Sequence, residues 1–300
     1  FLIDAVDEIK SSLSEKVDVI SKFIQDAMPH ENIRIVFTSR PIGEPSEEEK
    51  LDKALVRYEL QPLSVATMLK FIERICENQE ISARLKTDLY NSDLLRSLPK
   101  SPISAILLGR VLSTDAKELP SSLPELYAKY IDLALGRWDV AKGNASEKEY
   151  EAVSILVKLL ARHMLEADIY EVSLEKVLSL ISDYLAVRET GFSAINLLEV
   201  IKSHTEIVGI DEACGTLHFK HRSFSEFLYA ESLFNEYGKS AELPDPFDPY
   251  WGSVIYFYLG RLKDCPAQLT KLFSAIPKNE PARLIKLIQS SGYLLAAYHS

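Results

Sequence analysis

Three carboxylates lie close together at the start of the chain, in the stretch FLIDAVDEI. Three apolar residues lead into Asp4, and Asp7 and Glu8 follow shortly after it. A carboxylate at the end of a parallel strand can hold a hydrated Mg²⁺ ion beside the phosphates of a nucleotide, and a second one can orient or deprotonate an attacking water. Short acidic motifs also recur by chance, so the pattern leaves open that Asp7 and Glu8 only solvate the loop that follows.

A second strand-like stretch, IRIVFTSRP, ends in a different set of polar side chains. Thr38, Ser39 and Arg40 offer two hydroxyls and a guanidinium, and an arginine can stabilise the charge of a γ-phosphate. The alternative for Arg40 is a surface ion pair with the acidic loop IGEPSEEEKLD that follows it. Two strands that both end in groups suited to phosphate chemistry are less expected by chance than one, so together they indicate a nucleotide site.

The elements that must position these residues form a strand, a helix and a second strand. The strands cover residues 1–5 and 33–40, and residues 11–28 between them carry apolar side chains at helical spacing. A strand–helix–strand unit of this length has parallel strands and a right-handed crossover. Ligands bind beyond the carboxyl ends of such strands, which is where Asp4 and the segment 38–40 lie.

The sequence after this unit turns from strand-like to helical. Alternation in LVRYEL predicts a third strand over residues 55–60. Apolar stripes predict helices over residues 64–76, 101–112, 122–138, 151–167, 173–186 and 193–204. Residues 206–221 form a predicted β-hairpin around DEACG, and an amphipathic helix over 223–237 follows directly. Helices, then a hairpin, then a helix are the order of a winged-helix variant.

The last part of the chain begins with a linker-like stretch rich in Pro and Asp, residues 242–249. Residues 250–262 and 265–276 after it resemble the paired helices of a repeat. One or two copies do not establish a period.

The composition narrows the class of protein. A chain of 300 residues is longer than one compact domain usually is, so two to four units are expected. No run of about 18 apolar residues is present, which predicts no membrane span. The net charge of −10 argues against broad nucleic-acid binding, because such binding needs a basic surface. The three cysteines are far apart and fit neither a disulfide framework nor a metal-ligand pair, and a reducing cytoplasm is the simplest expectation.

Four motifs taken together carry a family resemblance. FLIDAVDEI, IRIVFTSRP, YELQPLS and FKHRSFSEFLYAESLF resemble the NACHT-type signal-transduction ATPases of the STAND class, which are related to AAA+ proteins. The resemblance covers roughly residues 1–240, in the same order and spacing. The last motif is the most specific one, and the residues that match the winged-helix signature of the family are Phe219, His221, Ser223, Phe224, Glu226 and Phe227.

The resemblance implies ATP or ADP with Mg²⁺ as cofactors, and roles for the residues after the first two strands. Asp4 would hold the Mg²⁺ ion through water. Asp7 and Glu8 would position the hydrolytic water, and either could be the main activating group. Arg40 would be the sensor arginine at the γ-phosphate.

Four further residues are implied to bind the nucleotide. Thr38 and Ser39 would contact it beside the first strand. His221 would contact the phosphates of bound ADP and stabilise the resting state, and Pro102 would line the adenine pocket in a helical lid. Without the resemblance, a histidine directly before an amphipathic helix is better explained as its cap or as packing on the hairpin.

One motif of the family is missing from the chain. No GxxxxGK[ST] sequence is present, and the stretch YGKS at 237–240 has Leu233 where the first glycine would stand. The resemblance therefore implies a longer protein in which the phosphate-binding loop precedes Phe1. That loop provides the backbone amides and the lysine that hold phosphates, so these 300 residues alone are expected to show negligible ATPase activity.

The predicted fold class is α/β followed by mostly α. The expected domains are the C-terminal part of a nucleotide-binding α/β domain (1–62), a helical lid (63–140), a winged-helix domain (141–240) and the start of a C-terminal helical repeat region (241–300).

The resemblance implies an ATP/ADP-dependent switch that acts in bacterial antiphage defence or immune-type signalling. A trigger, such as a phage or pathogen protein, would be sensed by the C-terminal region. Nucleotide exchange would then drive self-oligomerisation and activate a separate effector domain. Two alternatives stay open, a winged-helix transcriptional regulator that binds DNA and a helical scaffold that does not hydrolyse nucleotide. The acidic residues Glu226, Glu231 and Glu236 of the helix over 223–237 argue against the first, because they would repel DNA phosphates.

Overall fold

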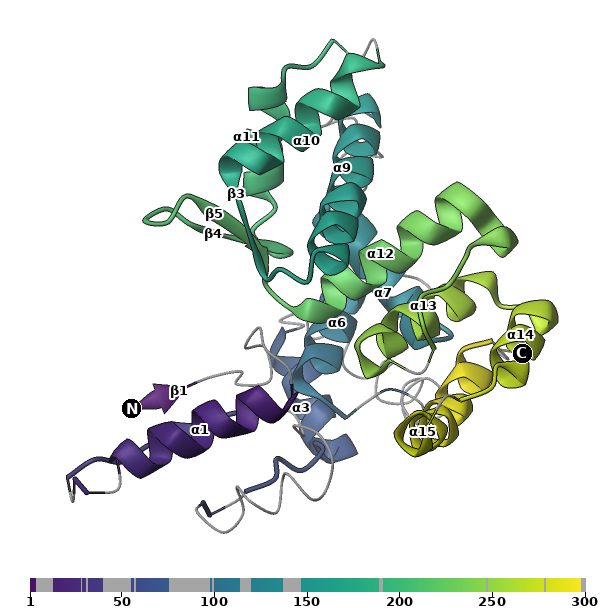
Figure 1. The fold of residues 1–300 in the computed structure, drawn as a ribbon. Helices are drawn as coiled ribbons and strands as arrows, with labels where there is room; N and C mark the ends of the chain where they lie inside the picture. Colours follow the sequence, from purple (N-terminus) through teal and green to yellow (C-terminus); the bar gives the residue numbers. More distant parts are fainter. Residues whose placement is uncertain are drawn as a thin grey trace. The chain divides into compact units, whose positions relative to one another are not determined.

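The computed structural model describes residues 1–3, 13–27, 29–30, 32–39, 55–56, 58–75, 98, 100–113, 120–136, 147–188, 191–246, 248–277 and 279–297. These residues are mostly helical, with one small parallel sheet and one small antiparallel sheet (Figure 1). The predicted fold class, α/β followed by mostly α, is confirmed at this level. The chain divides into two compact units, Phe1–Gln61 and Pro62–Ser300.

The first unit contains the predicted strand–helix–strand element. Strands β1 (Leu2–Ile3) and β2 (Val36–Phe37) pair in parallel, and helix α1 (Leu13–Ala27) connects them. Ile20 and Ile24 of α1 are buried, because they pack on the side chains of the two strands and on Leu55. The parallel pairing is confirmed, but both strands are shorter than predicted.

The predicted third strand over residues 55–60 is wrong for the part that the structure describes. Residues 55–56 and 58–60 pair with no other described strand. Val56, Tyr58 and Leu60 are exposed by 81%, 89% and 98%. Alternation selects which face a side chain takes, but a strand also needs a neighbour to which its backbone can hydrogen-bond.

The second unit is built from helices around one continuous core that extends from Met68 to Ala297. Among the described residues of this unit, the helices before Val208 are α3 (Val65–Ile75), α6 (Pro102–Ser113), α7 (Leu123–Ala134), α9 (Glu147–Glu166), α10 (Leu174–Ala186) and α11 (Ala194–Ser203). All six agree with predicted helices. The further division of this unit at residues 140 and 240 stays a prediction.

Serine caps explain where three of these helices begin. The side chains of Ser122, Ser173 and Ser193 accept hydrogen bonds from backbone N–H groups three residues later, at 3.2–3.3 Å. Each cap satisfies an amide that has no partner within its helix. Helices α7, α10 and α11 therefore start directly after a serine.

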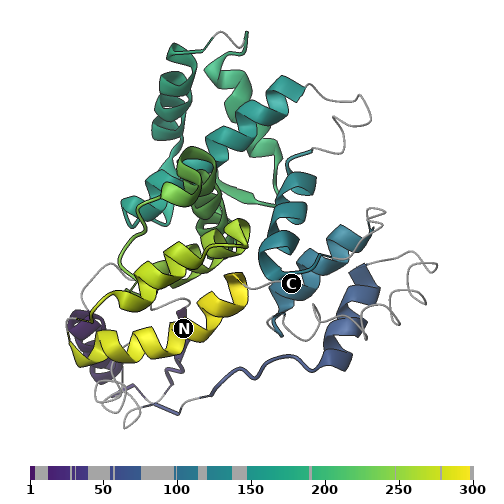
Figure 2. The same cartoon turned by 90° about the vertical axis from the view of Figure 1, so that its right-hand side faces the viewer.

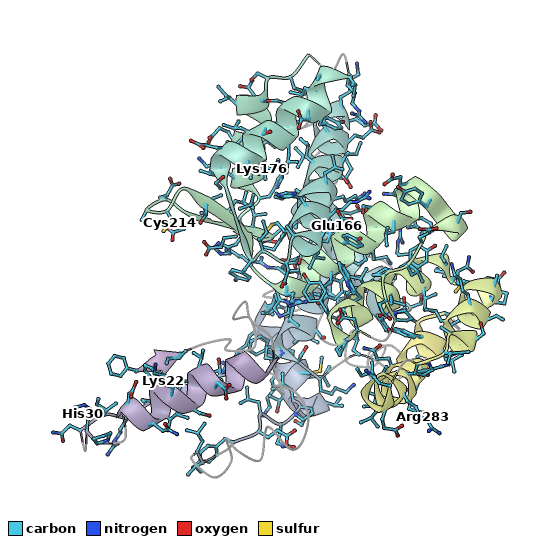
Figure 3. All side chains as sticks on the ribbon, viewed as in Figure 1. Lys22, His30, Glu166, Lys176, Cys214 and Arg283 are labelled. Carbon is cyan, nitrogen blue, oxygen red and sulfur yellow. The ribbon has the colours of Figure 1, made fainter. Side chains whose placement is uncertain are left out.

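The antiparallel sheet contains the predicted hairpin and one additional strand. Strands β4 (Val208–Asp211) and β5 (Thr216–Phe219) form the hairpin, and β3 (Glu171–Ser173) pairs with the other side of β5. Cys214 lies in the turn of the hairpin, at its outer end (Figure 3). The strand β3 was not predicted, because three residues are too few to show an alternation.

Helix α12 (Arg222–Tyr237) differs from its prediction as an amphipathic helix. Its ten consecutive residues from Phe224 to Leu233 are buried, because α9, α13 and α7 contact it on different sides (Figure 1). Glu166, at the end of α9, faces this helix and accepts a hydrogen bond from Tyr229 at 3.2 Å (Figure 3). Four polar residues of α12 are therefore buried in the core, namely Ser225, Glu226, Glu231 and Ser232.

In the described part of the chain after α12, the α-helices are α13 (Gly252–Leu262), α14 (Pro266–Ser274) and α15 (Glu280–Ala297) (Figure 2). The first two agree with the predicted pair, and α15 was not predicted. Helix α13 approaches α7 closely at Gly260, where a Cβ atom would lie 2.3 Å from the ring of Pro124. Among the described residues, no helix combines the length and the apolar composition that crossing a bilayer requires.

Candidate functional site

The residues predicted after the first two strands are only partly described. Asp4, Asp7, Glu8 and Arg40, predicted to bind the metal and to act on water and phosphate, lie outside the described residues.

Thr38 and Ser39 are described, and both side chains are exposed. The backbone N–H of Thr38 donates to the carbonyl oxygen of Ile3 at 2.9 Å. Since Asp4 is the residue after Ile3 in the sequence, the first residue after β2 is bonded to the last residue before Asp4. The carboxyl ends of both strands therefore meet at one edge of the parallel sheet, as predicted.

Pro102 occupies the first position of α6 and is exposed. A proline is favoured at this position, because its missing N–H would have no partner within the helix and its fixed φ suits a helix start. The hydroxyl of Ser101 also accepts from the N–H of Ser104 at 3.3 Å. These contacts explain the start of α6, and the predicted adenine contact of Pro102 stays a prediction.

His221 is the N-cap residue of α12. Its backbone is extended, with φ −145° and ψ 134°, and its Nδ1 accepts a hydrogen bond from the N–H of Ser223 at 3.2 Å. The alternative that His221 caps the helix is thus correct. The ring is exposed at the start of a helix whose following residues are buried, and its edge contacts Phe224, with 6.2 Å between ring centroids.

Ser223 connects His221 to helix α7. Its Oγ lies 2.5 Å from Nδ1 of His221, and it also accepts a hydrogen bond from the hydroxyl of Tyr127 at 2.8 Å. Tyr127 belongs to the predicted lid, whereas His221 and Ser223 belong to the predicted winged-helix domain. The sequence alone does not single out Tyr127, because 96 residues separate it from Ser223.

A second polar contact joins the predicted lid to the predicted winged-helix domain, close to the Tyr127–Ser223 hydrogen bond. Glu206, before β4, lies 3.3 Å from a guanidinium nitrogen of Arg110 on α6 and accepts a hydrogen bond from Tyr130 on α7 at 3.4 Å. Burial, together with the charge of Glu206, raises the pKa of Tyr130 to about 12. Tyr130 also stacks on Phe224, with centroids 5.6 Å apart.

Aromatic rings fill the space beneath these polar contacts. Tyr127 packs against Phe224, Phe227 and Phe257, with centroid distances of 6.2, 5.6 and 4.8 Å. Burial raises the pKa of Tyr127 to about 12, and the charge of Glu226 acts in the same direction. The hydroxyl therefore keeps its proton over the physiological range and remains a hydrogen-bond donor.

Two carboxylates of α12, Glu226 and Glu231, do not face outward as the sequence predicted. Glu226 and Glu231 are exposed by only 5% and 7%, and they pair with Arg222 and Arg261. Most of α12 is covered by other helices, so this helix cannot enter a DNA groove. The structure thus argues against DNA reading by α12 for a steric reason, and the expected repulsion of phosphates by these two carboxylates was wrong.

A cavity of about 490 Å³ lies among α7, α9, α12 and α13. Its lining includes the charged residues Asp132, Lys158, Glu231 and Arg261. Burial lowers the pKa of Lys158, against the opposite effect of Glu231 and Asp132. The charged lining of this cavity was not predicted, because the sequence shows these helices mainly by their apolar stripes.

The described residues contain no group of three or more His, Cys, Asp or Glu side chains that could hold a metal ion. His218 lies on β5, where its ring stacks on Tyr170 with centroids 5.7 Å apart. A Cβ atom on Gly209 of the neighbouring strand would lie 2.4 Å from Nε2 of His218. This histidine is therefore explained by packing between the strands.

The described candidate residues form two separate groups. One is the strand ends around Thr38 in the first unit, and the other is the hydrogen-bonded series Tyr127–Ser223–His221 in the second unit. No protein-family model matches the chain, and a search among curated proteins finds no match.

Proposed function

We propose that this chain is part of an ATP/ADP-dependent molecular switch of the NACHT type within the STAND class. The observation that carries the proposal is the parallel pairing of β1 and β2, which brings Thr38 next to the last residue before Asp4. This is the sheet edge at which nucleotides bind in open parallel sheets. The three carboxylates, Thr38, Ser39 and Arg40 of the two motifs supply the residue types that Mg²⁺ and phosphates require.

In this proposal, His221 contacts the phosphates of bound ADP and Pro102 contacts the adenine. The position of His221 at the exposed start of α12 supports such a role, because the well-packed helix holds the residue in place. ADP stabilises the resting arrangement, and ATP favours another one. Differential affinity for the two arrangements is what makes a nucleotide a switch.

The remaining steps are proposals from the family resemblance. The region 241–300 senses a trigger, such as a phage or pathogen protein. Exchange of ADP for ATP then drives self-association and activates an effector domain, as in antiphage defence or immune-type signalling. A cytoplasmic location fits these steps.

The test is the nucleotide content of the protein produced from its own gene and isolated without added nucleotide. Mass spectrometry after denaturation is expected to find ADP in near-stoichiometric amount. A His221→Ala variant is expected to lose most of it. Protein that is folded, contains no nucleotide and does not bind added ADP or ATP would contradict the proposal and favour the helical scaffold.

A second measurement concerns hydrolysis. The 300 residues alone lack the GxxxxGK[ST] motif and are expected to show negligible ATP turnover. Robust turnover by these residues that Glu8→Gln abolishes would show that the missing motif is not needed.

A further inference from the structure

The hydrogen bonds around Ser223 have a direction that specifies the protonation of the His221 ring. The backbone N–H of Ser223 can only donate, and it points at Nδ1 of His221 at 3.2 Å. Nδ1 must therefore carry a lone pair and not a proton.

The two hydroxyls continue this direction. Ser223 Oγ also faces Nδ1, at 2.5 Å, so its proton points to the lone pair. Ser223 Oγ can then only accept a further hydrogen bond, and it accepts one from the hydroxyl of Tyr127 at 2.8 Å. The proton order is thus Tyr127 O–H to Ser223 Oγ, and Ser223 O–H to His221 Nδ1. The proton of the neutral imidazole then lies on Nε2.

We infer that Tyr127 and Ser223 are positioning residues that hold His221 as the Nε2–H tautomer, in which Nε2 is a hydrogen-bond donor that suits a phosphate oxygen. The phosphate part of this inference rests on the function proposed above. A phosphate oxygen accepts hydrogen bonds and does not donate them, so the Nδ1–H tautomer would present a lone pair to it and repel it. These hydrogen bonds also make the Nε2–H donor of His221 depend on helix α7. A movement of Tyr127 away from Ser223 would free the serine hydroxyl to turn.

The packing around Tyr127 supports this role. Tyr127 is exposed by only 3%, and its ring is enclosed by Phe224, Phe227 and Phe257. A ring enclosed in this way keeps its hydroxyl in one place, so the direction of the hydrogen bond is fixed by the aromatic core and not by solvent.

The test reads the tautomer directly, by long-range ¹H–¹⁵N NMR of the 300-residue chain labelled at its histidine side chains. Protonated and unprotonated ring nitrogens give well-separated signals, and a His221→Gln spectrum assigns the residue among the six histidines. Unprotonated Nδ1 and protonated Nε2 are expected for the neutral ring. Ser223→Ala is expected to raise the Nδ1–H population several-fold, and Tyr127→Phe to raise it less.

Two variants keep the result specific. Ser223→Thr retains the hydroxyl and is expected to retain the Nε2–H tautomer. Tyr130→Phe removes a hydroxyl from the same helix as Tyr127. This hydroxyl donates to Glu206 and takes no part in the hydrogen bonds among Tyr127, Ser223 and His221. The His221 tautomer is therefore expected not to change. A proton on Nδ1 in the wild-type chain, or a tautomer that Ser223→Ala does not alter, would overturn the inference.

ADP retention by the same variants, measured in the protein produced from its own gene, separates this inference from the proposed function. Ser223→Ala is expected to weaken ADP binding roughly tenfold, the range of one lost hydrogen bond to a charged group, whereas Tyr130→Phe is not. The wild type could bind no ADP and still show the Nε2–H tautomer, with the tautomer lost in Ser223→Ala. In that case the proposed function fails and the positioning role stands. If ADP binds and the tautomer does not respond to Ser223→Ala, the positioning role fails alone.

Discussion

The two units of the chain differ in how their described residues form a core. In the first unit, the buried apolar residues are Ile20 and Ile24, which pack on Ile3, Phe37 and Leu55. In the second unit, one core continues from Met68 to Ala297. Burial of apolar surface is the dominant stabilising term in folding, so the two units are expected to respond differently to loss of a core side chain.

The residues with proposed roles are divided between the two units. The residues proposed to bind metal and activate water follow the strands of the first unit, whereas His221 belongs to the second.

Phe227→Ala should have the largest effect. The Phe227 side chain is exposed by only 1% and contacts the rings of Tyr127 and Phe257. Its loss should lower the free energy of unfolding of the second unit by about 3–5 kcal/mol, measured by chemical denaturation. Ile24→Ala is the matched change in the first unit, and hydrogen exchange should show faster exchange only within residues 1–61. Equal effects of Ile24→Ala on both units would show that they unfold together.

Arg261→Met should lower the stability of the second unit by about 2 kcal/mol. Glu231 is exposed by only 7%, and this substitution would remove the guanidinium that pairs with it. Loss of one partner leaves a buried charge uncompensated. The double variant Arg261→Met/Glu231→Leu should recover most of the loss in a thermal unfolding experiment.

The control for this pair is Arg283→Met on α15. Arg283 (Figure 3) lies 3.8 Å from Glu280, and both side chains are mostly exposed. Exposed pairs of this kind contribute little, so a change within about 0.5 kcal/mol is expected. A loss as large as that of Arg261→Met would mean that burial does not decide the strength of these pairs.

Lys158→Met should stabilise the second unit by about 1 kcal/mol at neutral pH. Lys158 lines the cavity, and it makes no hydrogen bond or ion pair with another described residue. Burial lowers its pKa, so at high pH the folded chain binds fewer protons than the unfolded chain does. Stability should therefore rise as the pH increases from the lowered folded pKa toward the unfolded value of 10.5.

The variant should lack this part of the pH dependence. Denaturation of wild type and Lys158→Met between neutral and alkaline pH tests the sign. A difference between the two that does not shrink as the pH rises would contradict it.

Apart from the Arg283→Met control, Ser122→Ala should have the smallest effect, a loss of about 0.5–1 kcal/mol. The Ser122 hydroxyl caps α7 by accepting from the N–H of Glu125 at 3.3 Å. Thermal unfolding measures the change, and Ser121→Ala is the neighbouring control, because Ser121 contacts the Glu125 side chain instead. A Ser122→Ala loss as large as that of Phe227→Ala would contradict a role limited to capping.

Much of the local structure could be predicted from the sequence. Serine caps and apolar stripes identify helices such as α7, α10 and α11, and a turn-rich segment between apolar runs identifies the β4–β5 hairpin. These signals are local, because each depends on residues within about one turn or one strand pair. The strand–helix–strand unit was found for the same reason.

The errors concern properties that are not local. The stretch 55–60 alternates like a strand but pairs with no described neighbour, and α12 has the composition of a surface helix but is buried. A buried glutamate such as Glu226 looks like a solvent-facing residue until the position of Arg222 and of the covering helices is known.

The sequence by itself determined where most helices and strands lie and singled out His221 and the residues after the first two strands as candidates. Only the tertiary structure decided that α12 lies inside the core and that Tyr127 bonds Ser223 across 96 residues. The physical reason is that helix periods and caps are set by neighbours along the chain. The direction of a hydrogen bond, and so the tautomer of His221, is set by whichever group the fold brings to it.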